Sequence, residues 1–147
     1  QCPVNSHCTA RLNDNVMAFP TPKPKKITPA KQVFFLVLQD EQQQFLLETR
    51  PNIGIWGGLR SFLEFNSITE AEDWCLQNHF PVLEKELLAE QRHTFSHYHL
   101  DYTPILIKTQ NHINNVMEAG QPVWYKTEQI NLLGLPAPIK KLFQNLY

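Results

Sequence analysis

The segment from Gln91 to Leu100 gathers side chains that could recognise a planar, polar ligand. It reads Gln-Arg-His-Thr-Phe-Ser-His-Tyr-His-Leu, with three histidines, two aromatic residues, one threonine and one serine in ten positions. Aromatic rings offer faces for stacking, and short hydroxyl groups both donate and accept hydrogen bonds. The segment lacks the paired acids or activated nucleophile that bond cleavage needs. Two interpretations stay open: a loop that presents these groups, or a hairpin with aromatics in a core and histidines in solvent.

The three cysteines do not form a disulfide framework in a chain of this size. Cys75 falls in a predicted amphipathic helix, where we expect a small buried apolar side chain. Cys2 and Cys8 are separated by five residues, a spacing that suits two ligands of a metal or iron–sulfur site whose other ligands would precede Gln1. Because two thiolates do not complete such a site, we expect no cluster to be held by this chain alone.

The composition indicates one folded domain without a strong electrostatic preference for polyanions. The chain has 147 residues, 42% of them hydrophobic, and a net charge of −1. Any binding to nucleic acid must therefore come from a local basic face or from another domain. No membrane-spanning run and no signal peptide is visible, so we expect a cytoplasmic protein, and a monomer. Since the first residue is Gln1 rather than methionine, we expect the chain to be a fragment.

Residues 1–31 are predicted to be a remnant of a cluster motif followed by an interdomain linker. Prolines fix φ and bar a helix, so residues 9–31 are expected to be extended. The closely spaced prolines and the basic residues of this stretch are Pro20, Pro22, Pro24, Pro29, Lys23, Lys25, Lys26 and Lys31. The lysines could contact phosphates or be merely solvated, and both readings stay open. At Gln32 the composition changes, and residues 32–147 are predicted to form the folded domain.

Hydrophobic patterning predicts an α+β domain with a mixed β-sheet flanked by helices. Strands are expected at residues 33–38, 44–48, 87–92, 98–108 and 122–125, with a polar loop at 111–120. Helices are expected at 68–78, 127–130 and 138–146, the first capped by Ser67 with Glu70 three positions later. Residues 50–59 form a loop with three glycines around Trp56, which we expect to anchor the loop in the core.

The glycine loop, the following helix and the strand order resemble the Nudix fold, whose loop–helix–loop carries a pattern of glycine, arginine and metal-binding glutamates. Starting that pattern at Gly58 places Glu64 on its first acidic position. The later positions, an Arg-Glu pair, two metal-binding glutamates and a glycine, are occupied here by Glu72, Asp73, Leu76, Gln77 and His79. Mg²⁺ needs clustered oxygen ligands, which a leucine and an amide cannot supply. The resemblance implies a Nudix scaffold without its catalytic metal site.

This loss, together with residues 54–59, 92–97 and 134–138, resembles the C-terminal domain of the MutY family of adenine DNA glycosylases. The spacing of Cys2 and Cys8 is similar to that of the last two ligands of the family's [4Fe–4S] motif, and the proline-rich stretch corresponds to its interdomain linker. The resemblance implies a base-excision repair enzyme that removes adenine mispaired with 8-oxoguanine in double-stranded DNA. It also implies that the catalytic residues, the rest of the cluster and an N-terminal catalytic domain lie before Gln1.

The resemblance maps the family's lesion-contacting loop onto Phe95, Ser96 and His97. A phenyl ring can wedge beside a base step, and a hydroxyl can pair with the altered Hoogsteen edge of an oxidised guanine. The imidazole of His97 can support the loop or approach a phosphate. Weaker candidates for phosphate contact are Arg92, Lys31 and Arg60.

Two alternatives from other classes remain open. The fold also suits a Nudix-type pyrophosphohydrolase that acts on free nucleotides, and a Nudix-like scaffold without a metal site could be a protein-interaction module. In the favoured reading the parent protein is a glycosylase with a [4Fe–4S] cluster, whereas this chain is non-catalytic and holds no cofactor.

Overall fold

The computed structural model of the chain describes residues 2–20, 24, 27–110 and 121–146. The polar loop predicted at 111–120 lies outside the described residues, as do Pro22, Lys23, Lys25 and Lys26 of the predicted linker. The N-terminal segment contains the 3₁₀ turn η1 (Asn5–His7), the short helix α1 (Thr9–Leu12) and the 3₁₀ turn η2 (Val16–Ala18). The prediction of an extended chain from residue 9 is therefore wrong at its start. The closely spaced prolines begin only at Pro20, so they do not restrict the backbone of α1.

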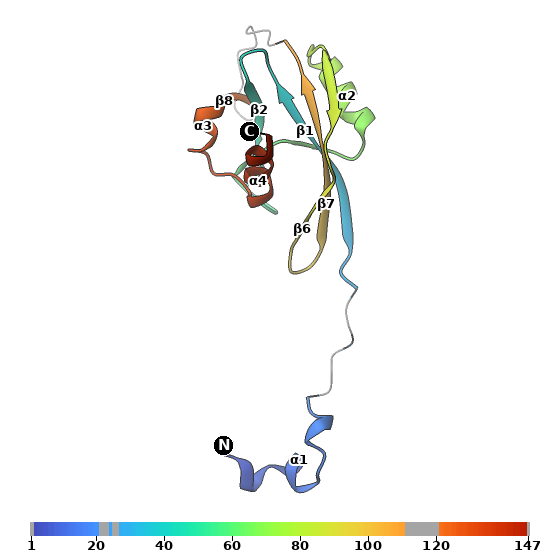
Figure 1. The fold of residues 1–147 in the computed structure, drawn as a ribbon, viewed down its shortest axis with the longest axis vertical. Coiled ribbons are helices and arrows are strands. Elements are labelled where there is room, and N and C mark those ends of the chain that lie inside the picture. Colours follow the sequence, from blue (N-terminus) through green and yellow to red (C-terminus); the bar gives the residue numbers. More distant parts are fainter. Residues whose placement is uncertain (1, 21–23, 25–26, 111–120, 147) are drawn as a thin grey trace.

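The folded part is built on a mixed β-sheet in which two long strands run parallel through the centre (Figure 1). Strand β1 (Ala30–Gln39) pairs in parallel with β7 (His99–Lys108) along its entire length, while the other strand pairs are antiparallel. The remaining strands are β2 (Gln44–Thr49), β3 (Arg60–Ser61), β4 (Leu63–Phe65), β5 (Glu84–Leu87), β6 (Gln91–Thr94) and β8 (Val123–Lys126). The expected mixed sheet is confirmed.

Strand β1 begins at Ala30, inside the segment predicted as linker. Its first residues pair with the start of β7, and the amide of His99 donates to the carbonyl of Pro29 at 2.8 Å. At its other end the chain turns back into β2 through Asp40, whose Oδ1 accepts from the amides of Gln42 and Gln44 at 2.9 and 2.7 Å. The strands predicted at 33–38 and 44–48 are confirmed and form an antiparallel hairpin, whose turn this aspartate defines.

The single strand predicted at 87–92 is wrong, because this region forms two strands. Both β5 and β6 pair with β7, β5 beside its second half and β6 beside its first half. Between them the amide of Leu88 donates to the carbonyl of Pro104 at 2.9 Å. Since Pro104 has no N–H to return a hydrogen bond, the regular ladder is interrupted there.

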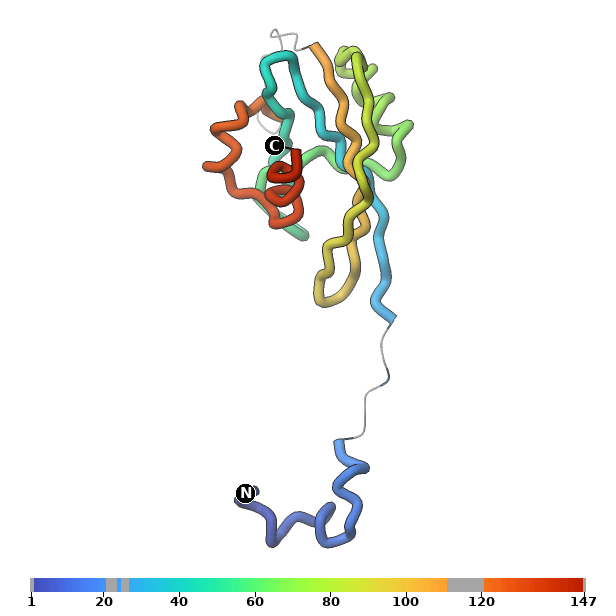
Figure 2. The backbone as a smooth tube through the Cα atoms, in the orientation of Figure 1, coloured from blue at the N-terminus to red at the C-terminus, as the bar shows by residue number. Residues whose placement is uncertain are grey.

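Helices pack on both faces of the sheet, and the alternation of side chains along β1 joins the two layers. Its residues Val33, Phe35 and Val37 are buried in one cluster with Ile139, Leu142 and Phe143 of α4 (Ala137–Leu146). Its residues Leu36 and Leu38 are buried in a second cluster with Ala71 and Cys75 of α2 (Ile68–Gln77). Successive strand residues point to opposite faces, so one apolar run serves both cores. Figure 2 shows the path of the backbone between these layers.

The three predicted helices match their positions to within one residue at each end. Ser67 caps α2 by accepting from the amide of Glu70 at 3.1 Å, and the Glu70 carboxylate accepts from the amide of Asn66 at 2.9 Å. The short helix α3 (Thr127–Ile130) follows β8 directly. None of the described helices is long and apolar enough to cross a membrane.

Candidate nucleic-acid interface

The segment that the sequence analysis singled out is the hairpin between β6 and β7, which we call the recognition hairpin (residues 91–102). Thr94 pairs with His99, and the amide of Phe95 donates to the carbonyl of Tyr98 at 2.9 Å, which closes a four-residue turn. Ser96 and His97 stand at the tip and are exposed. The two readings of the sequence are thus combined, because a hairpin with packed aromatics presents a short polar tip.

A cluster of rings supports this tip. Phe95 stacks on Tyr98 with ring centroids 4.7 Å apart and meets the edge of His93 at 4.6 Å. The ring of Trp56, from the glycine loop, lies 5.4 Å from Phe95 and 5.9 Å from His93. We call these four residues, Trp56, His93, Phe95 and Tyr98, the aromatic cluster. Such contacts restrain ring orientation, so Phe95 is held from several sides.

The tip side chains are less constrained. The Oγ of Ser96 lies 3.3 Å from Nδ1 of His97, a long contact for a hydroxyl. His97 also meets the ring of Tyr98 with centroids 5.0 Å apart. One flank of the turn is tied by Thr94, whose Oγ1 lies 3.0 Å from Nδ1 of His99. The hydroxyl of Ser96 is therefore available to an external partner.

The glycine loop positions Trp56 through its backbone. Trp56 has a φ of 61° and Gly58 a φ of 75°, the left-handed conformation that glycine adopts freely. A Cβ on Gly57 would lie only 2.6 Å from the carbonyl oxygen of Asn52, so the loop closes on itself at that position. Trp56 packs against the core cluster that includes residues of α4, as predicted.

Two of the three candidate phosphate contacts are held in ion pairs beside the recognition hairpin. Arg92 donates to both carboxylate oxygens of Asp101, at 2.5 and 2.7 Å, and this hydrogen bonding holds the pKa of Asp101 below its usual value. Lys31 lies 2.6 Å from Glu64. The side chains of Arg92 and Lys31 remain 57% and 55% exposed, so each can still face a ligand.

The third candidate, Arg60, is on β3, which the sheet order separates from β7 by two strands. Its guanidinium carbon lies 5.7 Å from the centre of the Tyr125 ring. The structure thus brings Arg92 and Lys31 to the two sides of β7 near the hairpin but engages Arg60 with β8.

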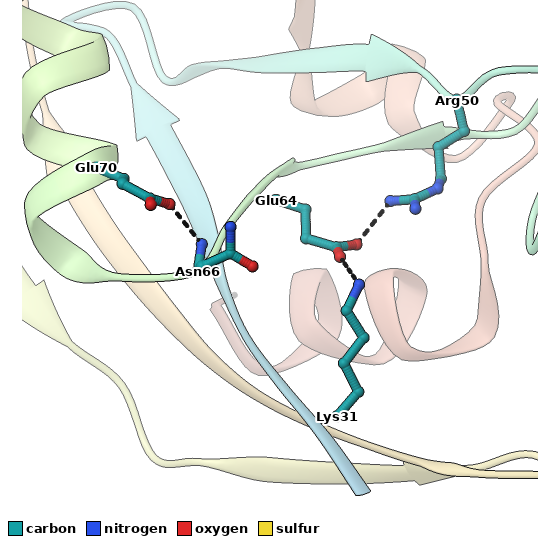
Figure 3. A network of polar contacts seen from close by, with 5 residues as sticks. All are labelled: Lys31, Arg50, Glu64, Asn66 and Glu70. Carbon is teal, nitrogen blue, oxygen red and sulfur yellow. Dashed lines mark hydrogen bonds and ion pairs between the residues drawn. The ribbon is translucent and has the colours of Figure 1, made fainter.

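Glu64 joins two cations from different segments (Figure 3). One carboxylate oxygen accepts from Lys31 at 2.6 Å and the other from Arg50 at 3.1 Å. Burial alone would raise the pKa of Glu64, but the hydrogen bond and charge of Lys31 and of Arg50 lower it below its usual value. The pKa of the neighbouring Glu48 is raised, chiefly by burial, although the positive charge of Arg50 acts to lower it.

The positions of the metal-binding glutamates in the Nudix pattern fall on α2. Leu76 is 76% exposed there and Gln77 is also exposed. Over the described parts of the chain, no group of three or more His, Cys, Asp or Glu side chains could hold a metal ion. The side chains at these two positions do not fit Mg²⁺, because neither Leu76 nor Gln77 offers a carboxylate.

The cysteines differ in environment. Cys2 is exposed and Cys8 partly exposed, on either side of η1, whereas Cys75 is fully buried as predicted. Thiolates can ligate an iron–sulfur cluster, and two of them would make up half of a four-cysteine set.

Two members of the site were not recognised from the sequence. Tyr98 supports Phe95 directly, and Arg50 links Glu64 to Trp56, with its guanidinium carbon 5.7 Å from the ring centre. Tyr98 could have been found from its position in the turn. Arg50 could not, because its partner Glu64 is fourteen residues away and the contact depends on how β2 and β4 are placed.

This architecture defines the class of protein: an α+β scaffold of Nudix type in which a hairpin carries the polar tip and α2 lacks the glutamates of the pattern. Residues 33–145 match the NUDIX domain family, and the chain belongs to that family. The predicted Nudix-like fold is thereby confirmed.

Curated relatives are similar to nearly the whole chain. The adenine DNA glycosylase of Buchnera aphidicola subsp. Baizongia pistaciae (strain Bp) is 32% identical over 146 residues, which cover 99% of this chain. The adenine DNA glycosylase of Buchnera aphidicola subsp. Acyrthosiphon pisum (strain APS) is 28% identical over 144 residues. The chain spans only 41% of the length of each of these relatives. The resemblance to adenine DNA glycosylases that the motifs indicated is confirmed.

Solved structures show the same fold. The C-terminal domain of mouse MUTYH, determined in complex with human PCNA, has a TM-score of 0.61 at 18% identity, covering 77% of this chain and 84% of that one. The NUDIX domain of Shewanella oneidensis NrtR, determined with ADP ribose, has a TM-score of 0.60 at 13% identity, covering 87% and 93%. At such identities these likenesses concern the fold alone.

Proposed function

We propose that this chain is the lesion-recognition domain of an adenine DNA glycosylase, a repair enzyme that removes adenine mispaired with 8-oxoguanine in double-stranded DNA. The observation that carries the proposal is the recognition hairpin, which presents Ser96 and His97 on a packed aromatic base. It is supported by the similarity of nearly the whole chain to adenine DNA glycosylases. Catalysis belongs to another part of the parent protein, and this chain breaks no glycosidic bond.

The chemistry of the tip suits an oxidised purine. Oxidation of guanine turns N7 into an N–H donor and adds an oxygen at C8, so the Hoogsteen edge offers a new donor and a new acceptor. The Ser96 hydroxyl can serve either group, because a hydroxyl both donates and accepts. Phe95 contacts a base step from its position in the aromatic cluster, and His97 supports the tip or meets a phosphate. Because the aromatic cluster holds the polar tip rigidly, less conformational entropy is lost when the tip binds its ligand.

Other parts of the proposal concern the parent protein. Arg92, Lys31 and Arg60 contact DNA phosphates, and residues 1–31 connect the domain to an N-terminal catalytic domain. Cys2 and Cys8 supply two of the four thiolates of a [4Fe–4S] cluster whose other ligands lie in that domain. The protein acts as a cytoplasmic monomer.

A substitution at the tip tests the function. In the full-length protein Ser96→Ala should reduce the preference for 8-oxoguanine:adenine over guanine:adenine substrates by about 1–3 kcal/mol, the usual worth of one base contact. The measurement is the ratio of single-turnover rates under subsaturating conditions on the two duplexes. Thr69→Ala is the control, because Thr69 also carries an exposed hydroxyl side chain but lies on α2, outside the recognition hairpin. An unchanged ratio in Ser96→Ala would remove the assignment.

The alternative that the chain is a nucleotide hydrolase is tested with the chain alone. Incubated with Mg²⁺ and 8-oxo-dGTP, the 147-residue chain should show no turnover, because Leu76 and Gln77 cannot ligate the metal. Robust hydrolysis would favour a Nudix pyrophosphohydrolase. Retained lesion preference in Ser96→Ala together with binding of a protein partner would favour an interaction module.

A further inference from the structure

Glu64 occupies the first acidic position of the Nudix pattern, yet its carboxylate contacts cations rather than other acids. It bridges Lys31 of β1 and Arg50, which follows β2, and its side chain is 18% exposed (Figure 3). A partly buried carboxylate between two cations binds them more strongly than a surface ion pair, since solvent screens it less. Glu64 is therefore held in ion pairs with Lys31 and Arg50 that do not depend on a metal.

Arg50 extends this connection to the glycine loop. Its Nη1 is oriented by Glu64, while its Nε is buried and has no hydrogen-bond partner within the described residues. Its backbone closes the loop, because its amide donates to Leu59 at 3.0 Å and its carbonyl accepts from Gly58 at 3.1 Å. Its guanidinium lies over Trp56 with 5.7 Å between the guanidinium carbon and the ring centre, a cation–π distance.

Trp56 completes the path to the recognition hairpin. Its ring lies 5.4 Å from that of Phe95, the residue directly before Ser96. Arg50 and Trp56 therefore link the carboxylate of Glu64 to the turn that carries the polar tip.

Lys31 provides a second route. It is the register partner of Leu100 on β7, one residue beyond the position at which β6 and β7 first pair across the turn. Tyr98 faces the same charges: burial raises its pKa, and the charges of Lys31, Glu64 and Arg50 also act on it. Lys31 therefore lies on the strand beside the start of β7, and its charge acts on Tyr98 in the turn.

We infer that Glu64 is a positioning residue for lesion recognition, which holds the tip of the recognition hairpin through Arg50, Trp56 and Phe95 and through Lys31. This inference rests on the proposed function for its biological meaning. Replacing the carboxylate by an amide removes the charge that joins Lys31 to Arg50, so Arg50 and Trp56 lose the position that supports Phe95. The acid at the first acidic position of the Nudix pattern thus acts on recognition, without touching the ligand.

The coupling is measured first in the 147-residue chain. In Glu64→Gln the indole N–H signal of Trp56 and the amide signal of Ser96 should both shift in ¹H–¹⁵N spectra. Glu72→Gln is the matched control. Glu72, on α2, also pairs with a lysine, Lys85 of β5, and both residues lie outside this network. Shifts confined to the neighbours of Glu64, with Trp56 and Ser96 as in the unsubstituted chain, would overturn the inference.

A double-mutant cycle tests the route. Arg50→Met removes the guanidinium, so adding Glu64→Gln to it should move the Trp56 signal further by much less than Glu64→Gln does alone. Glu64→Asp keeps the charge and should restore most of the Trp56 position. Equal effects of Glu64→Gln with and without Arg50 would exclude the path through this arginine.

The functional measurement separates the two ideas. In the full-length protein Glu64→Gln should lower the preference for 8-oxoguanine:adenine over guanine:adenine by roughly two- to thirtyfold, while the saturating rate on guanine:adenine stays the same. If Ser96→Ala lowers the preference and Glu64→Gln does not, the positioning role fails and the proposed function stands. If Ser96→Ala has no effect, the proposed function fails, and the spectra still decide whether Glu64 holds the hairpin.

Discussion

Phe95 and Ser96 are neighbours in the chain but have different environments. Phe95 is partly buried against three rings of the aromatic cluster, whereas Ser96 is exposed with only a long contact to His97. A buried ring and an exposed hydroxyl in adjacent positions place a small polar group on a rigid support. In the proposed function Phe95 both supports the turn and contacts a base step, while Ser96 contacts the oxidised base.

A prediction at the residue scale concerns the cysteine thiols. Burial, and to a smaller extent the charge of Glu72, raises the pKa of Cys75 to about 11, so its reactive thiolate is scarce at neutral pH. At about pH 7.5, iodoacetamide should modify Cys2 and Cys8 of the 147-residue chain and leave Cys75 unmodified until the chain is unfolded. Mass spectrometry of the peptides measures this order. Modification of Cys75 at the same rate as Cys2 would contradict its burial.

The glycine loop and the recognition hairpin act as a pair of elements. Residues 50–59 are closed by hydrogen bonds of Arg50 with Gly58 and Leu59, and this closure directs Trp56 towards the hairpin. Within the hairpin, β7 pairs with β6 on one side and with the parallel strand β1 on the other. The tip therefore depends on a loop that lies some forty residues earlier in the sequence.

A prediction at this scale tests the closed loop. In Gly57→Ala the new Cβ would meet the Asn52 carbonyl oxygen at 2.6 Å, so the loop must shift. We expect a loss of about 1–3 kcal/mol in the free energy of unfolding, as for overpacking elsewhere, together with weaker nuclear Overhauser contacts between Trp56 and Phe95. Denaturant unfolding and NMR provide the two measurements.

Gly134→Ala is the control for this substitution. Its Cβ would lie 3.1 Å from Cδ2 of Leu59, the end of a flexible side chain that can move away. A smaller loss of stability than in Gly57→Ala, with the Trp56–Phe95 contacts retained, is expected. Equal effects of the two substitutions would show that the loop is not tightly closed at Gly57.

For the molecule as a whole, acidic groups set the pH dependence of folding. Glu64 has a pKa below its unfolded value of 4.5, because Lys31 and Arg50 outweigh the effect of its burial. Its contribution to stability is present above that pH and is lost as the pH falls through the lower folded value. Glu48 has a raised pKa and acts in the opposite direction, so it partly offsets the loss.

The corresponding prediction compares unfolding at several pH values. The free energy of unfolding of the unsubstituted chain should fall as the pH is lowered from 5 to 3, roughly the range below the unfolded pKa of a glutamate. In Glu64→Gln this fall should be smaller, and in Glu41→Gln, an exposed turn residue, it should be the same as in the unsubstituted chain. Urea denaturation followed by circular dichroism measures the three curves. An unchanged slope in Glu64→Gln would mean that its ion pairs do not stabilise the fold.

Local sequence was sufficient for much of the architecture. The continuous apolar run at 33–38 predicted a strand buried on both faces, and the Ser67–Glu70 capping pattern predicted the start of α2. The predicted strand at 87–92 failed, since its interruption is caused by Pro104 on the neighbouring strand, which no local pattern near residue 88 reveals. The prediction of an extended segment failed at α1, because this helix precedes the closely spaced prolines, which restrict only the backbone near them.

The sequence by itself determined which residue types stand at the tip, which elements carry them and which acids are missing from α2. Its resemblance to adenine DNA glycosylases also predicted Phe95, Ser96 and His97 as the residues of the recognition loop. Only the tertiary structure decided that Glu64, Arg50, Trp56 and Phe95 form one path. Those residues lie on separate segments, and their contacts arise from the parallel pairing of β1 with β7 and from the closure of the glycine loop. Side-chain periodicity specifies which face of an element is buried, but it does not specify which element lies opposite that face.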